Sequence, residues 1–495
     1  MRTVVDPLIR AEAMHGPREA VVCGSTRRTF TEVLDRCHRV GGLLDALGLE
    51  SGARVALLAA NCAEYVEIYA GVPAAGRAVV PLNTRWADAE LRYALDDAGA
   101  AALITDRDPG DLADSVDTVI RLGDDYETRL AAANPQPYAE VGEDDIAGLF
   151  YTGGTTGQSK GVMLTHRNLV ANTLHSQITM PMDATTVCLV VAPMFHAAGS
   201  NSVLQCLALG SSQVIVPAFH PDTVLDLIEA EGCTNTLAVP TMLAAMIEAQ
   251  ASSPRRTESM RMIAHGASPI AMEVLRRAHE LFPSAELVHL YGATETAPLV
   301  TGLRNEEALT NLPQGKSAGQ PVLGVTVAID APEGEPGEVL VRGPNVMAGY
   351  WNKPDQTAEV LQNGWYRTGD VGYQDADGFL YLVDRAKDMI ISGGENVYCS
   401  EVEDVIYRHP KVLEATVFGV PNDQWGEQVH AVVVPRDPSL SEDELIDFCR
   451  NHLGGYKLPR SVAFQTEELP KSGPGKVLKR ELRRPYWEGR DRDIN

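Results

Sequence analysis

The chain has 495 residues, of which 44% are apolar and 22% charged, so it is a folded globular protein rather than a disordered chain or a collagen-like repeat. Its 67 Asp and Glu outnumber 42 Lys and Arg, giving a net charge of −25, and a surface this acidic repels nucleic acid and anionic membranes. One hydrophobic core seldom organises so long a chain, so we expect at least two domains.

Short apolar strand patterns alternate with amphipathic helical patterns from about residue 50 to 290. Residues 270–282 carry apolar side chains at 3.6-residue spacing, which predicts a helix. The alternation predicts an α/β fold, with a large N-terminal domain of mainly parallel, helix-covered sheets. The predicted strands are Arg54–Ala59, Ala78–Leu82, Ala101–Thr105, Val187–Ala192, Ser212–Val216, Thr236–Val239 and Glu286–Leu290.

The pattern changes after Gly319. Short strands separated by Pro and Gly predict a small β-barrel-like subdomain over about residues 320–384. A helix near 401–408, two strands and a second helix then predict a smaller α+β domain, and Ser441 and Glu444 form the pattern of a capping box at the start of that second helix. We therefore expect an N-terminal domain at 1–384 and a C-terminal domain at 385–495.

The most informative segment is residues 149–166, which read LFYTGGTTGQSKGVMLTH. Glycines let successive backbone N–H groups turn toward an anion, threonine hydroxyls donate hydrogen bonds, and Lys160 adds positive charge. The spacing is not that of a P-loop. The segment predicts a phosphate-binding loop; the alternative is an ordinary connection between a strand and a helix.

A second segment, Tyr-Gly-Ala-Thr-Glu-Thr at 291–296, follows the predicted strand that ends at Leu290. Functional groups of α/β domains gather at the carboxyl ends of strands. There an aromatic ring can stack on a purine, a threonine can bind phosphate, and a carboxylate can hold Mg²⁺. A purely structural turn is the alternative.

Two further segments lie toward the C-terminus. Residues 364–370 end in Asp370, whose carboxylate suits a ribose diol, although a hairpin capped by Asp is the alternative. Residues 469–476 form a Gly/Pro-rich turn that presents Lys476, although such a turn can also be a plain basic surface loop. Each segment is ambiguous when taken alone.

The compartment is predicted from what the sequence lacks. The eight cysteines include no CxxC pair and no zinc-ligand spacing, which favours reduced thiols over disulfides or a metal site. Arg10 and Glu12 interrupt the N-terminus, which does not resemble a signal peptide, and no apolar run approaches the roughly 20 residues that span a bilayer. We expect a cytoplasmic protein.

Together and in this order, the four segments resemble the adenylate-forming superfamily, and within it the acyl-CoA synthetase and aryl-CoA ligase branch. The likeness covers essentially the whole chain. It implies an AMP-forming acid–thiol ligase that uses ATP, Mg²⁺ and CoA. The ATP- and AMP-binding residues that it implies are Thr152, Gly153, Gly154, Thr155, Thr156, Gly157, Lys160, Gly266, Ala267, Tyr291, Asp370 and Arg385.

The resemblance also implies individual roles. Tyr291 is similar to the ring that stacks on adenine, and Asp370 to the carboxylate that binds ribose. Thr294 is implied to bind the α-phosphate and Glu295 the Mg²⁺. The chain departs from the family at Gly153, where Ser is common, so that its loop has one hydroxyl donor fewer.

In the C-terminal part, Lys476 matches the lysine of the adenylation step and Lys387 stands at the hinge position. The family rotates its small domain about this hinge, so that a second loop replaces the lysine for thioester formation. The resemblance implies CoA-binding roles for Gly393 and Gly394. Tyr456 and Lys457 are candidates for the distal end of CoA, although a solvated basic patch is an equal alternative.

His196 matches the histidine that lies beside the acyl carboxylate, and we count it with the catalytic residues Lys476, Thr294 and Glu295. It is not predicted to be a general base, because a carboxylate nucleophile is already ionised. The implied acyl pocket has small walls without Arg or Lys, which leaves room for a bulky or long acid and disfavours a dicarboxylate. These walls are Ala197, Ala198, Gly199, Val239, Ser268 and Ala293.

The main prediction is a ligase that activates a medium- or long-chain fatty acid and transfers it to CoA, in fatty acid metabolism, with release of AMP and pyrophosphate. Two alternatives remain: an aryl or phenylpropenoic acid–CoA ligase of the coumarate, ferulate or benzoate type, and transfer to a carrier protein. The expected partners are a carboxylic acid, ATP and CoA, with no nucleic acid and no membrane span. A homodimer is left open.

Overall fold

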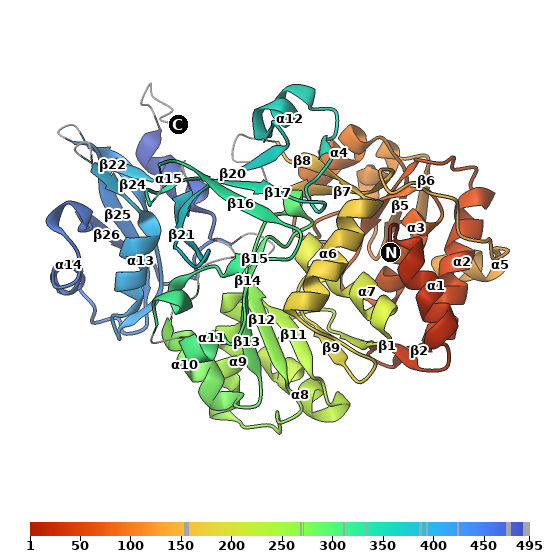
Figure 1. The fold of residues 1–495 in the computed structure, drawn as a ribbon, viewed down its shortest axis with the longest axis horizontal. Helices are drawn as coiled ribbons and strands as arrows, with labels where there is room; N and C mark the ends of the chain where they lie inside the picture. Colours follow the sequence, from red (N-terminus) through yellow and green to blue (C-terminus); the bar gives the residue numbers. More distant parts are fainter. Residues whose placement is uncertain are drawn as a thin grey trace.

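The computed structural model describes residues 1–152, 158–267, 270, 272–309, 312–332, 334–385, 389–392, 395–422, 425–471 and 477–488. Within these ranges the strands form four sheets. The elements nearest the N-terminus, such as α1 (Val5–Met14) and α2 (Phe30–Ala46), lie at one end of the molecule, and the C-terminal elements lie at the opposite end (Figure 1). No helix among the described residues is long and apolar enough to cross a membrane.

In the first large sheet, the strands from β13 to β1 are paired in parallel, and the three strands at its edges are antiparallel. It contains nine strands in the described part of the chain, in the order β15 (Gln320–Pro321), β14 (Thr301–Leu303), β13 (Glu286–Tyr291), β12 (Met262–Gly266), β11 (Asn235–Ala238), β9 (Val187–Val190), β10 (Ser212–Ile215), β1 (Glu19–Cys23) and β2 (Thr26–Thr29).

One face of this sheet is covered by α8 (Pro221–Glu231), α9 (Pro240–Ser252) and α10 (Met272–Leu281), which share a hydrophobic core with it. Helix α10 forms because Leu275, Ala278 and the following Phe282 return to one side at helical spacing and are buried there. The helix predicted at 270–282 is thereby confirmed, with its start at Met272.

The second large sheet is again mainly parallel, with β8 and β18 antiparallel at one edge. Helix α4 (Asp88–Ala98) packs on its outer face, while α2, α3 (Ala63–Ala74), α6 (His166–Thr179) and α7 (Ala197–Leu209) contribute to the core between the two sheets. Its described strands run in the order β18 (Gly349–Tyr350), β8 (Lys160–Thr165), β7 (Ile146–Thr152), β4 (Ala78–Pro81), β3 (Arg54–Leu58), β5 (Ala100–Thr105) and β6 (Thr118–Arg121).

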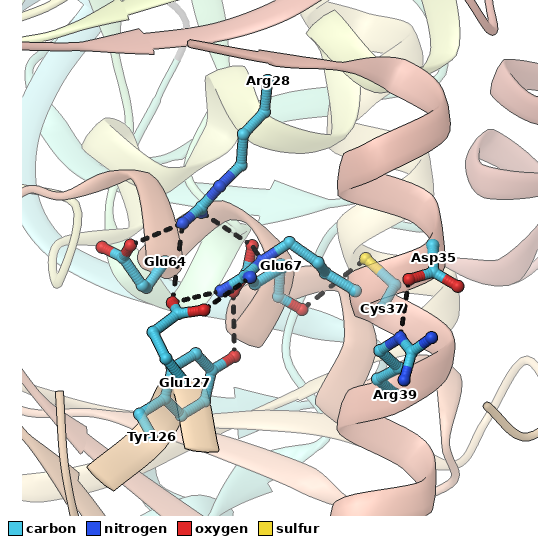
Figure 2. Close-up of polar contacts among 9 residues, drawn as sticks. Arg28, Asp35, Cys37, Arg39, Glu64, Glu67, Tyr126 and Glu127 are labelled. Carbon is cyan, nitrogen blue, oxygen red and sulfur yellow. Dashed lines mark hydrogen bonds and ion pairs between the residues drawn. The ribbon is translucent and has the colours of Figure 1, made fainter. Parts of the chain in front are cut away.

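A buried cluster of charges joins α2, α3, α5 (Asp124–Ala132) and β2. The side chain of Glu67 in α3 is fully buried. Its carboxylate accepts hydrogen bonds from Arg28 (3.0 Å), Arg36 (2.7 Å) and the hydroxyl of Tyr126 (3.0 Å). Arg36 also grips Glu127 with two bonds of 2.6 and 2.8 Å. Figure 2 shows Glu67 with Arg28 on one side and Tyr126 on the other. The cluster neutralises a charge that burial alone would make costly.

The third sheet is antiparallel and lies after Gly319, where short strands separated by Pro and Gly predicted a small β-barrel-like subdomain. The observed elements are β16 (Thr326–Asp330), β17 (Gly337–Arg342), β19 (Leu361–Gln362), β20 (Trp365–Gln374) and β21 (Leu380–Arg385), with α12 (Pro354–Val360) between β18 and β19. The long strand β20 pairs with β17, β19 and β21 and carries Asp370 near its middle.

The fourth sheet belongs to the C-terminal part and has its own core with α13 (Cys399–Tyr407) and α14 (Glu442–Arg450). Its strands are β22 (Ile390–Ser392), β23 (Glu395–Val397), β24 (Val412–Asn422), β25 (Gly426–Pro435) and β26 (Ser461–Phe464), and α15 (Lys479–Trp487) packs on β24. Ser441 caps α14 as predicted, by accepting the N–H of Glu444, but the Glu444 carboxylate pairs with Lys411 at 2.9 Å. The α/β architecture with a small C-terminal domain is confirmed.

Candidate active site

The predicted phosphate-binding loop connects β7 to β8. Thr152, the last residue of β7, is the register partner of Lys160, the first residue of β8, so the two strands bring both ends of the loop together. The loop therefore joins two antiparallel strands and not a strand and a helix. Five predicted loop residues lie outside the described residues: Gly153, Gly154, Thr155, Thr156 and Gly157.

Tyr291 and Asp370 meet although 79 residues separate them: the Tyr291 hydroxyl donates to Oδ2 of Asp370 at 2.7 Å. Tyr291 ends β13, and Asp370 lies in β20 of the third sheet. The tyrosine ring predicted to stack on adenine and the carboxylate predicted to bind ribose are thus in direct contact. Arg385 is the backbone partner of Asp370 across β20 and β21, but its side chain lies outside the described part.

Close backbone packing explains two glycines beside this pair. A Cβ on Gly292 would lie 1.7 Å from the carbonyl oxygen of Pro298, and one on Gly266 would lie 2.3 Å from that of Leu290. Any side chain at either position would displace the strand end that carries Tyr291. Ala267, predicted for the same pocket, follows β12 with a φ of +68°.

Thr294 and Glu295 lie in a short 3₁₀ turn (Thr294–Thr296) directly after Tyr291. The buried amide of Asn345 holds this turn by donating to the carbonyl oxygens of Thr296 (2.8 Å) and Leu299 (2.7 Å). The Thr294 side chain is buried, whereas that of Glu295 is partly exposed. The turn therefore presents a carboxylate close to Tyr291 on a fixed backbone.

Tyr350 connects Glu295 with Lys160. Its hydroxyl donates to Oε1 of Glu295 at 2.9 Å, and the Lys160 ammonium lies over its ring, 4.9 Å from the centroid. Burial and the neighbouring Glu295 carboxylate raise the pKa of Tyr350, so the hydroxyl keeps its proton and acts as the donor. The sequence reasoning missed Tyr350 because it lies outside the four motifs; its only local signal is the Gly-Tyr-Trp run at 349–351.

Glu295 can be tested as a Mg²⁺ ligand from its surroundings. One carboxylate oxygen accepts from Tyr350, and the described residues give the other no hydrogen-bond donor. Mg²⁺ prefers oxygen ligands, and in nucleotide sites it is usually held by one or two carboxylates, phosphate oxygens and water. The carboxylate therefore fits a magnesium site completed by nucleotide phosphates.

His196 is the N-cap of α7, where its Nδ1 accepts the N–H of Ala198 at 3.4 Å. Burial lowers its pKa to about 4, so the ring is neutral near pH 7 and Nε2 carries the proton. A neutral ring can donate one hydrogen bond to a nearby acid without adding charge.

The loop that leads to His196 is held by Asn61, a buried residue that the sequence reasoning also missed. Its amide donates to the carbonyl oxygens of Ala192 (3.0 Å) and Val216 (3.2 Å) and accepts the N–H of Met194 at 2.7 Å. Asn61 therefore ties the segments after β9 and β10 to the chain before α3 and fixes where α7 begins.

Most of the predicted acyl-pocket residues cluster at the starts of α7 and α9. Ala197 and Val239 are buried, and Ala198 and Ala293 are partly exposed. Gly199 allows close backbone packing rather than widening a pocket, because a Cβ at this position would lie 2.0 Å from the Pro193 carbonyl oxygen. Ser268 lies outside the described residues.

The C-terminal candidates are described only in part. Lys476, Lys387, Gly393 and Gly394 lie outside the described ranges. Tyr456 is 41% exposed, and Lys457 is held by Glu401 at 2.7 Å. The guanidinium of Arg460 stacks 3.6 Å from the centre of the Trp425 ring. The Lys457 ammonium also lies 5.5 Å from the centre of the Tyr456 ring, so these two predicted residues lie side by side.

The sequence matches the family model of the AMP-binding enzyme over residues 9–351 and that of the AMP-binding enzyme C-terminal domain over 401–476. Feruloyl-CoA synthase from an Amycolatopsis species is 39% identical over 97% of this chain and 98% of that protein. A long-chain-fatty-acid–CoA ligase from Escherichia coli is 35% identical over 97% of this chain and 94% of that protein.

The structure of O-succinylbenzoate coenzyme A synthetase from Bacillus subtilis, in complex with ATP and magnesium ion, matches with a TM-score of 0.86. It is 31% identical and covers 96% of this chain and 99% of its own. The fold is that of the adenylate-forming class. The chain belongs to the family of AMP-binding enzymes, and its activity is that of an AMP-forming acid–CoA ligase.

Proposed function

We propose that the protein is a CoA ligase for an aromatic acid of the phenylpropenoic type. The observation that carries this is the likeness, over nearly the full length of both chains, to a feruloyl-CoA synthase at 39% identity. The likeness to O-succinylbenzoate coenzyme A synthetase, which also acts on an aromatic acid, supports it. These comparisons favour the aryl alternative over the fatty acid that the sequence alone put first. A fatty acid remains the second candidate because of the 35% identical long-chain ligase.

In the first half-reaction, the substrate carboxylate attacks the α-phosphorus of ATP, the bond to pyrophosphate breaks, and acyl-AMP forms. Thr294 and the ammonium of Lys476 would stabilise the negative charge on the α-phosphate oxygens, while Lys160 and the loop at 153–157 hold the other phosphates. Tyr291 would stack on adenine, and Asp370 would accept from the ribose hydroxyls. Glu295 would hold Mg²⁺, which would add positive charge beside the phosphates.

In the second half-reaction, the CoA thiolate attacks the acyl carbonyl carbon and the bond to AMP breaks. We propose that residues 385–495 form a mobile domain that turns about Lys387 between the two steps. The separate core of the fourth sheet supports this, since such a unit can move as a body. Gly393 and Gly394 would leave room for the pantetheine arm, with Tyr456, Trp425 and Arg460 toward its distal end.

A panel of acids tests the proposal. The protein is incubated with ATP, Mg²⁺ and CoA and with ferulate, coumarate, benzoate or fatty acids of graded length, and the thioesters are identified by mass spectrometry. We expect feruloyl- or coumaroyl-CoA to form with the highest kcat/KM. Faster turnover of a fatty acid would favour the second candidate. Acyl-AMP without thioester would indicate a different acceptor, such as a carrier protein.

A further inference from the structure

Tyr350 stands between two groups of opposite charge that the proposed reaction uses. Its hydroxyl donates to the Glu295 carboxylate at 2.9 Å, and its ring lies under the Lys160 ammonium at 4.9 Å. An aromatic face attracts a cation, and a phenol hydroxyl donates well to a carboxylate. One side chain thereby contacts both charged groups.

The backbone around Tyr350 fixes the same two groups. The N–H of Met347 donates to the carbonyl oxygen of Glu295 at 2.8 Å, and that of Trp351 donates to the carbonyl oxygen of Gly161, next to Lys160, at 2.8 Å. The segment 347–351 thus bonds to the peptide of the carboxylate at one end and to the peptide beside the lysine at the other.

Tyr350 itself has little freedom to move. Its side chain and backbone are 6% exposed, its N–H donates to the Thr357 hydroxyl at 2.9 Å, and it pairs with Val162 across β18 and β8. The indole N–H of Trp351 donates to the Asp97 carbonyl oxygen at 3.0 Å and anchors the chain just beyond it. Because Tyr350 is held firmly, its contacts can restrict the movement of the groups that it touches.

We propose that Tyr350 is a positioning residue that orients the Glu295 carboxylate for Mg²⁺ and the Lys160 ammonium for the phosphates of ATP. This inference rests on the proposed function. The hydroxyl donates to one oxygen of Glu295 and leaves the other available for Mg²⁺, so its loss would free the carboxylate to rotate. The ring supports Lys160 independently of the hydroxyl, so the two contributions can be separated by substitution.

The test measures ATP binding by titration calorimetry, once with excess MgCl₂ and once with EDTA, and needs no carboxylic acid. In Tyr350→Phe the ring remains and the hydroxyl is lost, so we expect the Mg²⁺-dependent gain in ATP affinity to shrink about tenfold, the size of one hydrogen bond to a charged group. Affinity in EDTA stays unchanged. In Tyr350→Leu the ring is lost as well, and affinity falls in both conditions.

Tyr126→Phe is the matched control, because Tyr126 is also a buried tyrosine whose hydroxyl donates to a glutamate, Glu67, in the cluster of Figure 2. We expect this variant to bind ATP as the unmodified protein does under both conditions. Equal Mg²⁺ dependence in Tyr350→Phe and the unmodified protein, or equal losses in Tyr350→Phe and Tyr126→Phe, overturns the inference. If the unmodified protein binds ATP with Mg²⁺ but ligates none of the acids, the proposed substrate class fails while this inference stands.

Discussion

Two buried asparagines hold the two sides of the site. Asn61 fixes the loop before His196 with three hydrogen bonds, and Asn345 fixes the turn of Thr294 and Glu295 with two. Each amide satisfies backbone groups that water cannot reach. The proposed acid side and the proposed nucleotide side therefore depend on different single residues.

We predict that Asn61→Ala and Asn345→Ala each lower the free energy of unfolding by about 3 kcal/mol, because each leaves buried backbone groups unsatisfied. Their kinetic effects differ. Asn61→Ala raises KM for the acid about tenfold with little change for ATP, and Asn345→Ala does the reverse. Steady-state kinetics with each substrate varied in turn, below the unfolding temperature, distinguish the two. Equal effects on both substrates would contradict the separate roles.

The residues that the sequence could predict are those inside contiguous motifs. Tyr291, Glu295 and Asp370 lie in such motifs, and the structure brings the first and last together. Tyr350, Asn61 and Asn345 act through contacts with residues 46 to 190 positions away, the farthest being Lys160 over the ring of Tyr350. Their own neighbourhoods carry no sign of those contacts, so only the fold reveals them.

At the scale of elements, the buried charges around Glu67 join three helices and a strand. Arg28 comes from β2, Arg36 from α2, Glu67 from α3, and Tyr126 and Glu127 from α5 (Figure 2). Glu67 is fully buried, whereas the side chain of Glu127 is 44% exposed. The packing of these elements therefore depends more on Glu67 than on Glu127.

We predict that Glu67→Gln lowers the free energy of unfolding by about 3–5 kcal/mol, because it leaves two largely buried guanidinium groups short of a carboxylate. Glu127→Gln removes a partly exposed partner and costs about 1 kcal/mol or less. Denaturant unfolding of the two variants measures both values. Similar losses in the two variants would show that burial does not decide the effect.

Element types were predictable where the hydrophobic pattern was long. The helix predicted at 270–282 and the seven predicted strands between 54 and 290 are explained by buried apolar residues at regular spacing. The connection after β7 was not predictable, because glycines and threonines indicate a loop but not the type of element that comes after it. In the capping box predicted at Ser441, the Glu444 carboxylate was expected to accept the N–H of Ser441. It pairs instead with Lys411, a tertiary contact that the local sequence does not indicate.

At the scale of the whole molecule, four imidazoles make stability depend on pH. Burial lowers the pKa of His166, His175, His196 and His289 from 6.5 to about 4. The unfolded chain therefore binds more protons than the folded protein between these values. The stability that this provides is complete above about pH 6.5 and declines as the pH falls toward 4.

We expect the melting temperature to fall as the pH is lowered from about 7.5 to about 5, and to fall less in His175→Gln, which keeps a polar side chain but cannot become charged there. Differential scanning fluorimetry of both proteins across this range tests the prediction. Parallel curves would mean that His175 titrates alike in the folded and unfolded chains.

The proposed movement of the C-terminal domain also belongs to the whole molecule. We predict that Lys476→Ala lowers acyl-AMP formation by roughly 10²–10³-fold or more, as expected for removal of a placed cation, while supplied acyl-AMP and CoA still give thioester. The two half-reactions are measured separately. Equal loss of both would refute the assignment of Lys476 to adenylation alone.

The hydroxyl bond between Tyr291 and Asp370 has a consequence for recognition. Because its hydroxyl is hydrogen-bonded to Asp370, the Tyr291 side chain is held in one rotamer before any ligand binds. In the proposed role of Tyr291, little conformational entropy would then be lost when adenine stacks on the ring. The nucleoside would meet a ring whose orientation is already fixed, so that ordering the ring would take little from the binding affinity.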